Sequence, residues 1–202
     1  MNFIKNSPKY KHWYPIYAVM LGSGLIIGEV TGLRTEDIDF KHNVINVTHT
    51  LVFYDRSKAK KTGFGINTPK TKAEYRSVPM IKTVRDELLD QKQYLKDNNL
   101  KSVDIIDGFS DFIFVNRFSH VQHQGNLNKA IKRIVRYANF DALEKDPSIK
   151  EENLLPNFSC HTLRYTFTTR LVESGVIVKV IQNALGHSDI QTTLNIYADV
   201  TK

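Results

Sequence analysis

A single run of strand-forming residues, with helical patterns before and after it, limits the folds open to this chain. From Val44 the sequence reads Val-Ile-Asn-Val-Thr-His-Thr-Leu-Val-Phe-Tyr, which is rich in β-branched and aromatic residues and ends at a polar stretch. This run predicts a β-hairpin or a small sheet. The segment Arg76-Ser77-Val78-Pro79 predicts a further short strand, because a proline can end a strand but does not fit inside a central one. Lys70 is therefore expected in a loop or turn between strands.

Apolar residues at helical spacing fill most of the remaining sequence. Residues 13–21 follow this spacing and contain a proline suited to the first helical turn. After the break Gly22-Ser23-Gly24, a second helix is expected to run to about Gly32. The other expected helices are 82–97, 126–138 and most of the C-terminal segment, with breaks at Gly175 and 186–188, whereas 140–157 is expected to form a loop or short helix. The order helices, small sheet, helices indicates a mainly helical α+β domain.

The balance of charges favours a polyanionic partner. The 202 residues include 28 lysines and arginines against 21 aspartates and glutamates, which gives a formal net charge of +7. This excess favours nucleic acid first and a membrane surface second, although mild basicity also serves solubility in many proteins. The length fits one domain with a substantial core.

The sequence shows no sign of export or membrane insertion. Its single cysteine, Cys160, excludes an intrachain disulfide framework and fits a reducing compartment. The longest apolar runs are far too short to cross a bilayer, and the N-terminus lacks the basic and apolar regions of a signal peptide. We therefore expect a cytoplasmic protein with no membrane partner.

Cationic residues recur along the helix expected at 126–138. They are Lys129, Lys132, Arg133 and Arg136. A solvated polar face is one interpretation of such a run, and a face that contacts DNA phosphates is the sharper alternative.

Three short segments near the C-terminus carry the residues suited to phosphoryl transfer. They are His161-Thr162-Leu163-Arg164, Leu185-Gly186-His187-Ser188 and Tyr197. Moving a DNA phosphodiester onto a protein hydroxyl needs a nucleophile, proton handling and charge stabilisation at the phosphate oxygens. Any one of these residues alone is more often structural, but their order and spacing together favour a site.

These segments resemble the signatures of the tyrosine recombinase family. In this chain His187 stands 23 positions after Arg164, and Tyr197 stands ten after His187; both separations are typical of that family. The resemblance implies an α+β catalytic domain, mainly helical, with a small antiparallel β-sheet. Tyr197 would attack the phosphorus and hold a 3′-phosphotyrosyl link without a cofactor or metal. His161 and Arg164 lie three residues apart, hence on one helical face, where the guanidinium can fork two phosphate oxygens beside the imidazole. His187 would donate to the remaining oxygen.

A lysine completes the set that the resemblance implies. Lys70, in Thr68-Pro69-Lys70-Thr71-Lys72, resembles the mobile hairpin lysine of the family, which protonates the departing 5′-oxygen. Lys72 lies two residues further on and is the alternative candidate for this role. If Lys70 is the proton donor, we expect Lys72 to contact DNA.

The pattern breaks at the first catalytic arginine of the family. The usual Gly-Leu-Arg-apolar-small-Glu reads Gly24-Leu25-Ile26-Ile27-Gly28-Glu29 here, so Ile26 occupies the arginine position and Glu29 keeps that of the acidic partner. Isoleucine cannot donate to a phosphate, and losing one charged contact predicts severely slowed cleavage. Arg34 is eight residues further on and is not expected to reach. Tyr165 replaces a histidine that many relatives have, which is a minor departure.

Three functions are compatible with these residues. The first is site-specific recombination or integration of a phage or transposon, by a domain that binds double-stranded DNA and associates with copies of itself through the tail after Tyr197. The second is a catalytically disabled DNA-binding remnant or regulator of an integrase, favoured by Ile26. The third is a type IB topoisomerase, which the short spacing from His187 to Tyr197 disfavours. We expect 1–202 to form one catalytic domain, without the N-terminal core-binding domain that relatives carry.

Overall fold

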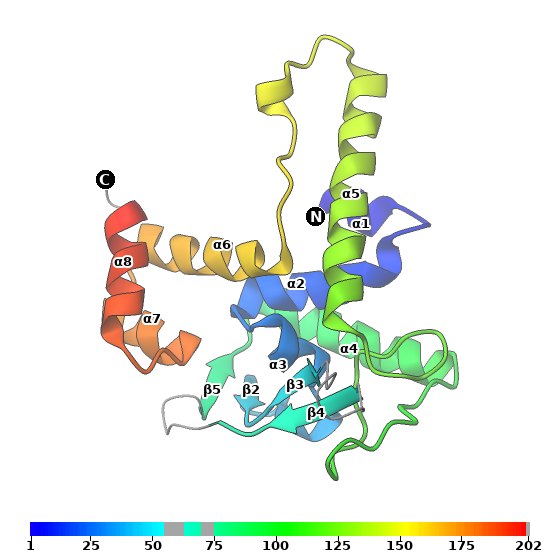
Figure 1. Cartoon of the computed structure of the whole chain (residues 1–202), viewed down its shortest axis with the longest axis vertical. Coiled ribbons are helices and arrows are strands. Elements are labelled where there is room, and N and C mark those ends of the chain that lie inside the picture. Colours follow the sequence, from blue (N-terminus) through cyan, green and yellow to red (C-terminus); the bar gives the residue numbers. More distant parts are fainter. Residues whose placement is uncertain (55–62, 70–74, 201–202) are drawn as a thin grey trace.

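Two small antiparallel sheets lie at one end of a mainly helical fold in the computed structural model, which describes residues 1–54, 63–69 and 75–200 (Figure 1). The side chains of Tyr197, Asp199 and Val200 lie outside this description. The α-helices are α1 Asn2–Asn6, α2 Tyr14–Ser23, α3 Ile27–Thr31, α4 Lys82–Asp97, α5 Gln124–Lys145, α6 Cys160–Glu173, α7 Val178–Leu185 and α8 Ile190–Val200. Single 3-10 turns are η1 Lys11–Trp13, η2 Thr35–Asp37 and η3 Glu151–Asn153, and the strands are β1 Ile38–Asp39, β2 Val44–Val47, β3 Thr50–Tyr54, β4 Gly63–Asn67 and β5 Arg76–Pro79.

The predicted strand run divides between two sheets. Strands β1, β2 and β5 form one antiparallel sheet in that order, and β3 pairs with β4 in the other. The division falls at His49, whose buried ring donates through Nε2 to the carbonyl of Gly32 at 2.7 Å and accepts from the Thr48 hydroxyl at Nδ1. A ring anchored in the core bends the chain out of the first sheet, which residue composition alone does not reveal. The predicted strand at Arg76–Pro79 is confirmed as β5.

Helix α2 is the centre of the main core. Its residues Tyr17, Val19 and Met20 are fully buried, and it packs against both α4 and α6. The Tyr17 hydroxyl donates to the carbonyl of Leu127 in α5 at 2.8 Å, so the buried ring also satisfies its polar atom. The helix predicted at 13–21 is therefore confirmed. Its successor is shorter than predicted, because Gly24 turns left-handed with φ +68° and helical geometry resumes only at Ile27.

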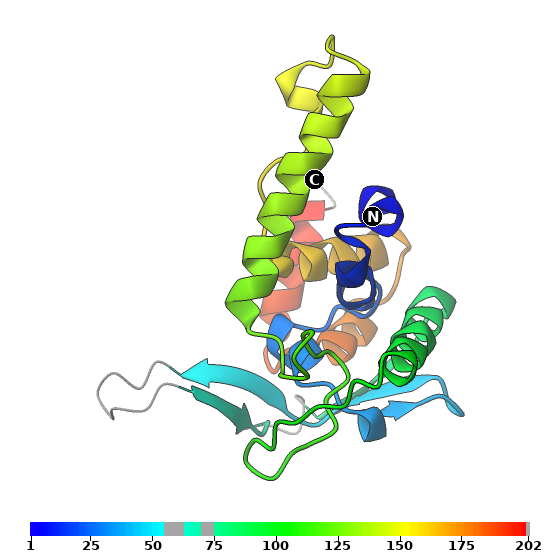
Figure 2. The same cartoon turned by 90° about the vertical axis from the view of Figure 1, so that its right-hand side faces the viewer.

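Helix α5 continues past the predicted end at residue 138 to Lys145. The extension consists largely of good helix formers, and Lys145 pairs with Asp141 one turn earlier at 2.7 Å. The second half of α5 projects away from the other helices, and the chain returns beside it through η3 to α6 (Figures 1 and 2). Helices α6, α7 and α8 occupy the C-terminal segment, with breaks at Gly175 and Gly186 as predicted.

Candidate active site

Arg164 is the buried centre of the candidate site. It lies in α6 with 8% of the residue exposed, and its Nη1 donates to the carbonyl of Gly24 at 2.7 Å. Its Nη2 donates to the carbonyl of Leu185 at 2.7 Å and contacts His187 Nε2 at 3.1 Å. The guanidinium thus joins the end of α2 to the end of α7. Burial lowers the pKa of Arg164 to about 10, so the side chain stays charged at neutral pH.

His187 follows the left-handed cap of α7 at Gly186, and its ring is bonded on both sides. Nε2 faces the Arg164 guanidinium, and Nδ1 lies 3.0 Å from the Thr193 hydroxyl in α8. Burial, and then the positive charges of Arg164 and Arg76, lower the pKa of His187 to about 4. The ring is therefore neutral at physiological pH.

Glu29 and Arg76 form a buried ion pair beside Arg164. The two Arg76 Nη atoms each donate to one Glu29 oxygen at 2.8 Å, while Arg76 Nε donates to the carbonyl of Ala184 at 2.8 Å. Arg76 and Arg164 thus satisfy consecutive carbonyls in the last turn of α7, where helical partners are missing. Sequence reasoning assigned Arg76 only to a strand. The signal that could have identified it is the alternation along the strand, because Arg76 stands two residues before the buried Val78 and so shares its inward-facing side.

Ile26 stands next to this ion pair as the residue before α3. Its backbone N–H donates to Glu29 Oε2 at 2.9 Å, which is one half of a capping box. Arg34 does not substitute for the missing cation, because its guanidinium pairs with Asp37 and lies over the Phe109 ring at 4.4 Å. The position predicted to lack a charge therefore lies beside the charged groups of Glu29 and Arg76, which are already engaged with each other.

The remaining predicted catalytic residues are placed less completely. His161 lies in the first turn of α6 with an exposed ring, 5.3 Å from the ring of Tyr165. Tyr197 lies in α8, but its side chain is outside the described part of the chain. Lys70 and Lys72 are outside the described residues. The structure thus brings together Arg164, His187 and Glu29, and it gives no contact between them and His161.

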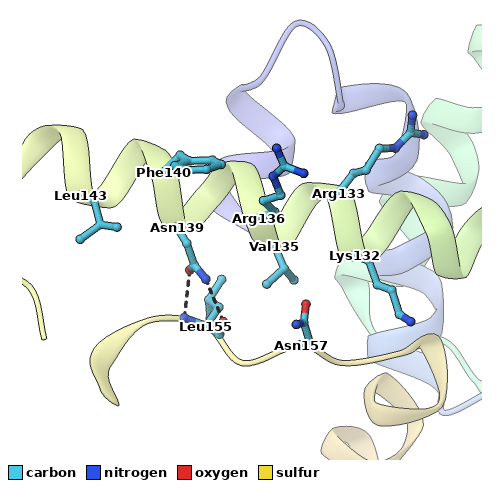
Figure 3. A pocket seen from close by; sticks show the side chains of 9 residues that line it. All are labelled: Lys132, Arg133, Val135, Arg136, Asn139, Phe140, Leu143, Leu155 and Asn157. Carbon is cyan, nitrogen blue, oxygen red and sulfur yellow. Dashed lines mark hydrogen bonds between the residues drawn. The ribbon is translucent and has the colours of Figure 1, made fainter. Parts of the chain in front are cut away.

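The four cations predicted to bind DNA form an exposed stripe on α5, opposite its buried residues. In Figure 3, Lys132 points to the side of the helix where the returning chain runs, whereas Arg133 and Arg136 point to the other side. The stripe borders a cleft of about 450 Å³ between α5 and the returning chain. Asn139 holds that chain by bonding both backbone polar groups of Leu155 at 2.9 Å. DNA contact by this stripe stays a prediction.

Comparison with known proteins decides the family. The model of the phage integrase family matches residues 1–202. The chain belongs to the phage integrase family. The fold predicted from the tyrosine recombinase resemblance is confirmed by a solved Tn1549 transposon integrase in complex with transposon right-end DNA. That structure is 31% identical, has a TM-score of 0.83, and is matched over 97% of this chain and 57% of its own.

Relatives of this member of the phage integrase family include transposases and recombinases. The transposase from transposon Tn916 of Enterococcus faecalis is 33% identical over 199 residues, which cover 98% of this chain and 45% of the transposase. A XerC-like tyrosine recombinase of Caldanaerobacter subterraneus subsp. tengcongensis is 28% identical over 98% of this chain and 48% of its own length. The XerA recombinase, at 19% identity and TM-score 0.67, shares the fold. The chain spans about half the length of these curated relatives.

Replacing Gly24 with alanine is expected to lower the free energy of unfolding by about 2–4 kcal/mol. A left-handed conformation strains any residue with a Cβ by about 1–2 kcal/mol, and a Cβ here would lie 2.3 Å from the ring of Phe167. Gly175→Ala is the matched control, because Gly175 is also left-handed but has open space around it. Urea denaturation of both variants measures the difference. Equal losses would contradict the close packing of Phe167 on Gly24.

Protonation of His187 is expected to destabilise the folded domain. Its pKa falls from the ordinary value of 6.5 to about 4, so between these values the unfolded chain binds a proton that the folded chain does not. The free energy of unfolding should therefore fall as the pH is lowered from about 6.5 toward 4. The charged groups that act on the ring are Arg164, in contact with Nε2, and Arg76, whose own charge is paired with Glu29. NMR titration measures the pKa, and a value at or above 6.5 would contradict the contact with Arg164.

Proposed function

We propose that this chain is the DNA-cleaving domain of a site-specific recombinase or integrase. Tyr197 attacks a DNA phosphodiester, its oxygen becomes bonded to the 3′-phosphate, and the 5′-oxygen leaves with a proton that the resemblance assigns to Lys70. The phosphotyrosyl ester keeps the bond energy, so a second DNA end reverses the step without a cofactor or metal. The observation that carries this proposal is the contact between Arg164 and His187, two residues that are 23 positions apart in the sequence. This contact lies near the position of Ile26.

The charges near the site explain why we expect cleavage to be slow. Arg164 and Arg76 bring two positive charges, Glu29 brings one negative charge, and His187 is neutral. Of the five guanidinium N–H groups of Arg164, its described contacts use three, which leaves two for a phosphate. Ile26 adds none. A phosphodiester in transfer therefore meets less positive charge than a site with two available arginines would give it.

A second candidate function follows from the same residue. With Ile26 in place, the chain would occupy recombination sites as a non-cleaving DNA-binding protein or regulate an active integrase. Retention of His161, Arg164, His187 and Tyr197 favours the first function. A protein that only binds DNA needs neither a nucleophilic tyrosine nor the two histidines and the buried arginine that would serve it.

Double-stranded DNA is the partner that the charge favours. The net charge of +7 and the exposed stripe of Lys129, Lys132, Arg133 and Arg136 suit phosphate contacts, and the similar Tn1549 integrase was solved with DNA. We expect copies of the protein to associate on that DNA, with the tail after Tyr197 as the means, and the reaction to occur in the cytoplasm. No helix in the described ranges has the length and apolar character needed to cross a membrane.

The test begins with selection of a bound duplex from a random library. The selected duplex is then nicked beside its centre, so that cleavage releases a short fragment and traps a covalent protein–DNA adduct. We expect the parent to form the adduct slowly and Tyr197→Phe to form none. Tyr165→Phe is the matched control, because Tyr165 is an exposed tyrosine beside His161. Binding without an adduct would favour the second function, and failure to select any duplex would contradict both.

A further inference from the structure

His187 has every polar group bonded, and helices α6, α7 and α8 supply the partners. Its backbone N–H donates to the carbonyl of Gln182 at 3.2 Å, and its carbonyl accepts from the Gln182 side-chain amide at 3.0 Å. The ring contacts Arg164 through Nε2 and Thr193 through Nδ1. Gln182 therefore fixes the backbone, and the two ring contacts fix the orientation of the imidazole.

The contact with Arg164 determines which ring nitrogen carries the proton. A guanidinium only donates, so Nε2 must accept and must be unprotonated. A neutral imidazole has one N–H, which then lies on Nδ1 and donates to the Thr193 hydroxyl oxygen at 3.0 Å. In this arrangement both ring nitrogens of His187 are engaged, so the donation to a phosphate oxygen that the family resemblance implies requires one of these two contacts to open when DNA binds.

Thr193 is buried and lies on the helix of the nucleophile. None of the residue is exposed, and it precedes Tyr197 by four positions in α8. Residues four apart lie on the same face of a helix, about one turn from each other. Helix α8 packs against both α6 and α7, so the bond from Thr193 to His187 sets the rotation of α8 where it meets those helices.

We propose that Thr193 is a positioning residue for the strand-transfer site, which deepens the proposed function and rests on it. Its hydroxyl holds His187 as the Nδ1–H tautomer, so that Nε2 receives Arg164, and it anchors the turn of α8 that leads to Tyr197. In the protein without DNA, His187 thereby orients the guanidinium of Arg164. Arg164 supplies N–H donors to the phosphate. Thr193 fixes the position of these donors and of helix α8, which contains Tyr197.

The tautomer is tested on the protein alone, before any DNA is added. NMR of chains with ¹⁵N-labelled histidine distinguishes a protonated Nδ1 from a protonated Nε2. We expect a protonated Nδ1 at His187 in the parent and in Thr193→Ser, which keeps a hydroxyl. Thr193→Val has the same shape without the acceptor, and a protonated Nε2 population is expected to appear. Thr192→Val is the matched control, because Thr192 is exposed on the same helix. A protonated Nε2 in the parent would overturn the proposal.

The second readout is the rate of covalent attachment to the nicked duplex. Loss of one neutral hydrogen bond corresponds to about 1 kcal/mol, so we expect Thr193→Val to be slower by roughly 5–10-fold, with recovery in Thr193→Ser. Attachment by Thr193→Val at the parental rate, with an unchanged tautomer, would overturn the positioning role. If the parent has the expected tautomer but forms no adduct, the proposed cleavage fails, while the assignment of His187 and Thr193 stands on the NMR result.

Discussion

Substituting Ile26 with arginine is expected to accelerate covalent attachment to DNA by about 10²–10³-fold, the size of effect seen when one preorganised charged or polar donor is removed from such sites. Glu29 would not hold the new guanidinium in a two-bond pair, because three of the roughly four acceptor positions of its carboxylate are already used, two by Arg76 and one by the Ile26 backbone. The added charge therefore stays available to the phosphate. It would also add donors to the two that Arg164, engaged with Gly24, Leu185 and His187, leaves for a phosphate.

The rate comparison requires a neutral variant of similar size. Ile26→Met keeps an apolar side chain of similar volume and leaves the backbone bond to Glu29 in place. Single-turnover attachment of the parent, Ile26→Met and Ile26→Arg to the same nicked duplex gives the three rates. An arginine variant no faster than the methionine variant would show that position 26 does not face the scissile phosphate.

Removing the guanidinium of Arg76 is expected to lower the free energy of unfolding by about 3–5 kcal/mol. The side chains of Arg76 and Glu29 are only 7% and 9% exposed, and breaking a buried pair leaves a charge without compensation. Arg76→Ala also leaves the carbonyl of Ala184 without its donor. Because that carbonyl precedes Gly186 and His187, attachment to DNA should slow as well.

Denaturation of a set of variants separates the charge from the packing. Lys145→Ala breaks an exposed pair with Asp141 and should cost less than about 1 kcal/mol. Replacing Glu29 and Arg76 together with methionine removes both charges and should recover most of the stability lost in Arg76→Ala. If Arg76→Ala costs no more than Lys145→Ala, the buried pair does not stabilise the domain.

The sequence predicted elements well where one local pattern determined them. The spacing of apolar residues identified α2, α4 and the three C-terminal helices, since each buries one face or is buried all round. The division of the strand run at His49 depends on a bond to Gly32, which is distant in sequence and leaves no periodic signal. The length of α5 was underestimated because its outer half is stabilised locally and does not depend on an apolar face toward the core.

For the site, motif spacing predicted which residues lie in contact better than it predicted where their side chains point. The pairing of Arg164 with His187 follows the family pattern, and the two residues are in contact. The inward direction of the guanidinium depends on the carbonyls of Gly24 and Leu185, which are exposed to it only because one helix ends in a left-handed glycine and another lacks helical partners in its last turn. Arg76 was missed because its partner, Glu29, is 47 residues away.

Mass spectrometry of the trapped adduct tests the central claim most directly. The Ile26→Arg protein is incubated with the selected nicked duplex, digested with protease and nuclease, and searched for a nucleotide-modified peptide. Our account predicts a nucleotide attached through phosphate to Tyr197, and no modified peptide from the Ile26→Arg, Tyr197→Phe double variant. A modification on Tyr165 or another residue, or a bound but unmodified protein, would contradict the claim that this integrase domain transfers DNA strands through Tyr197.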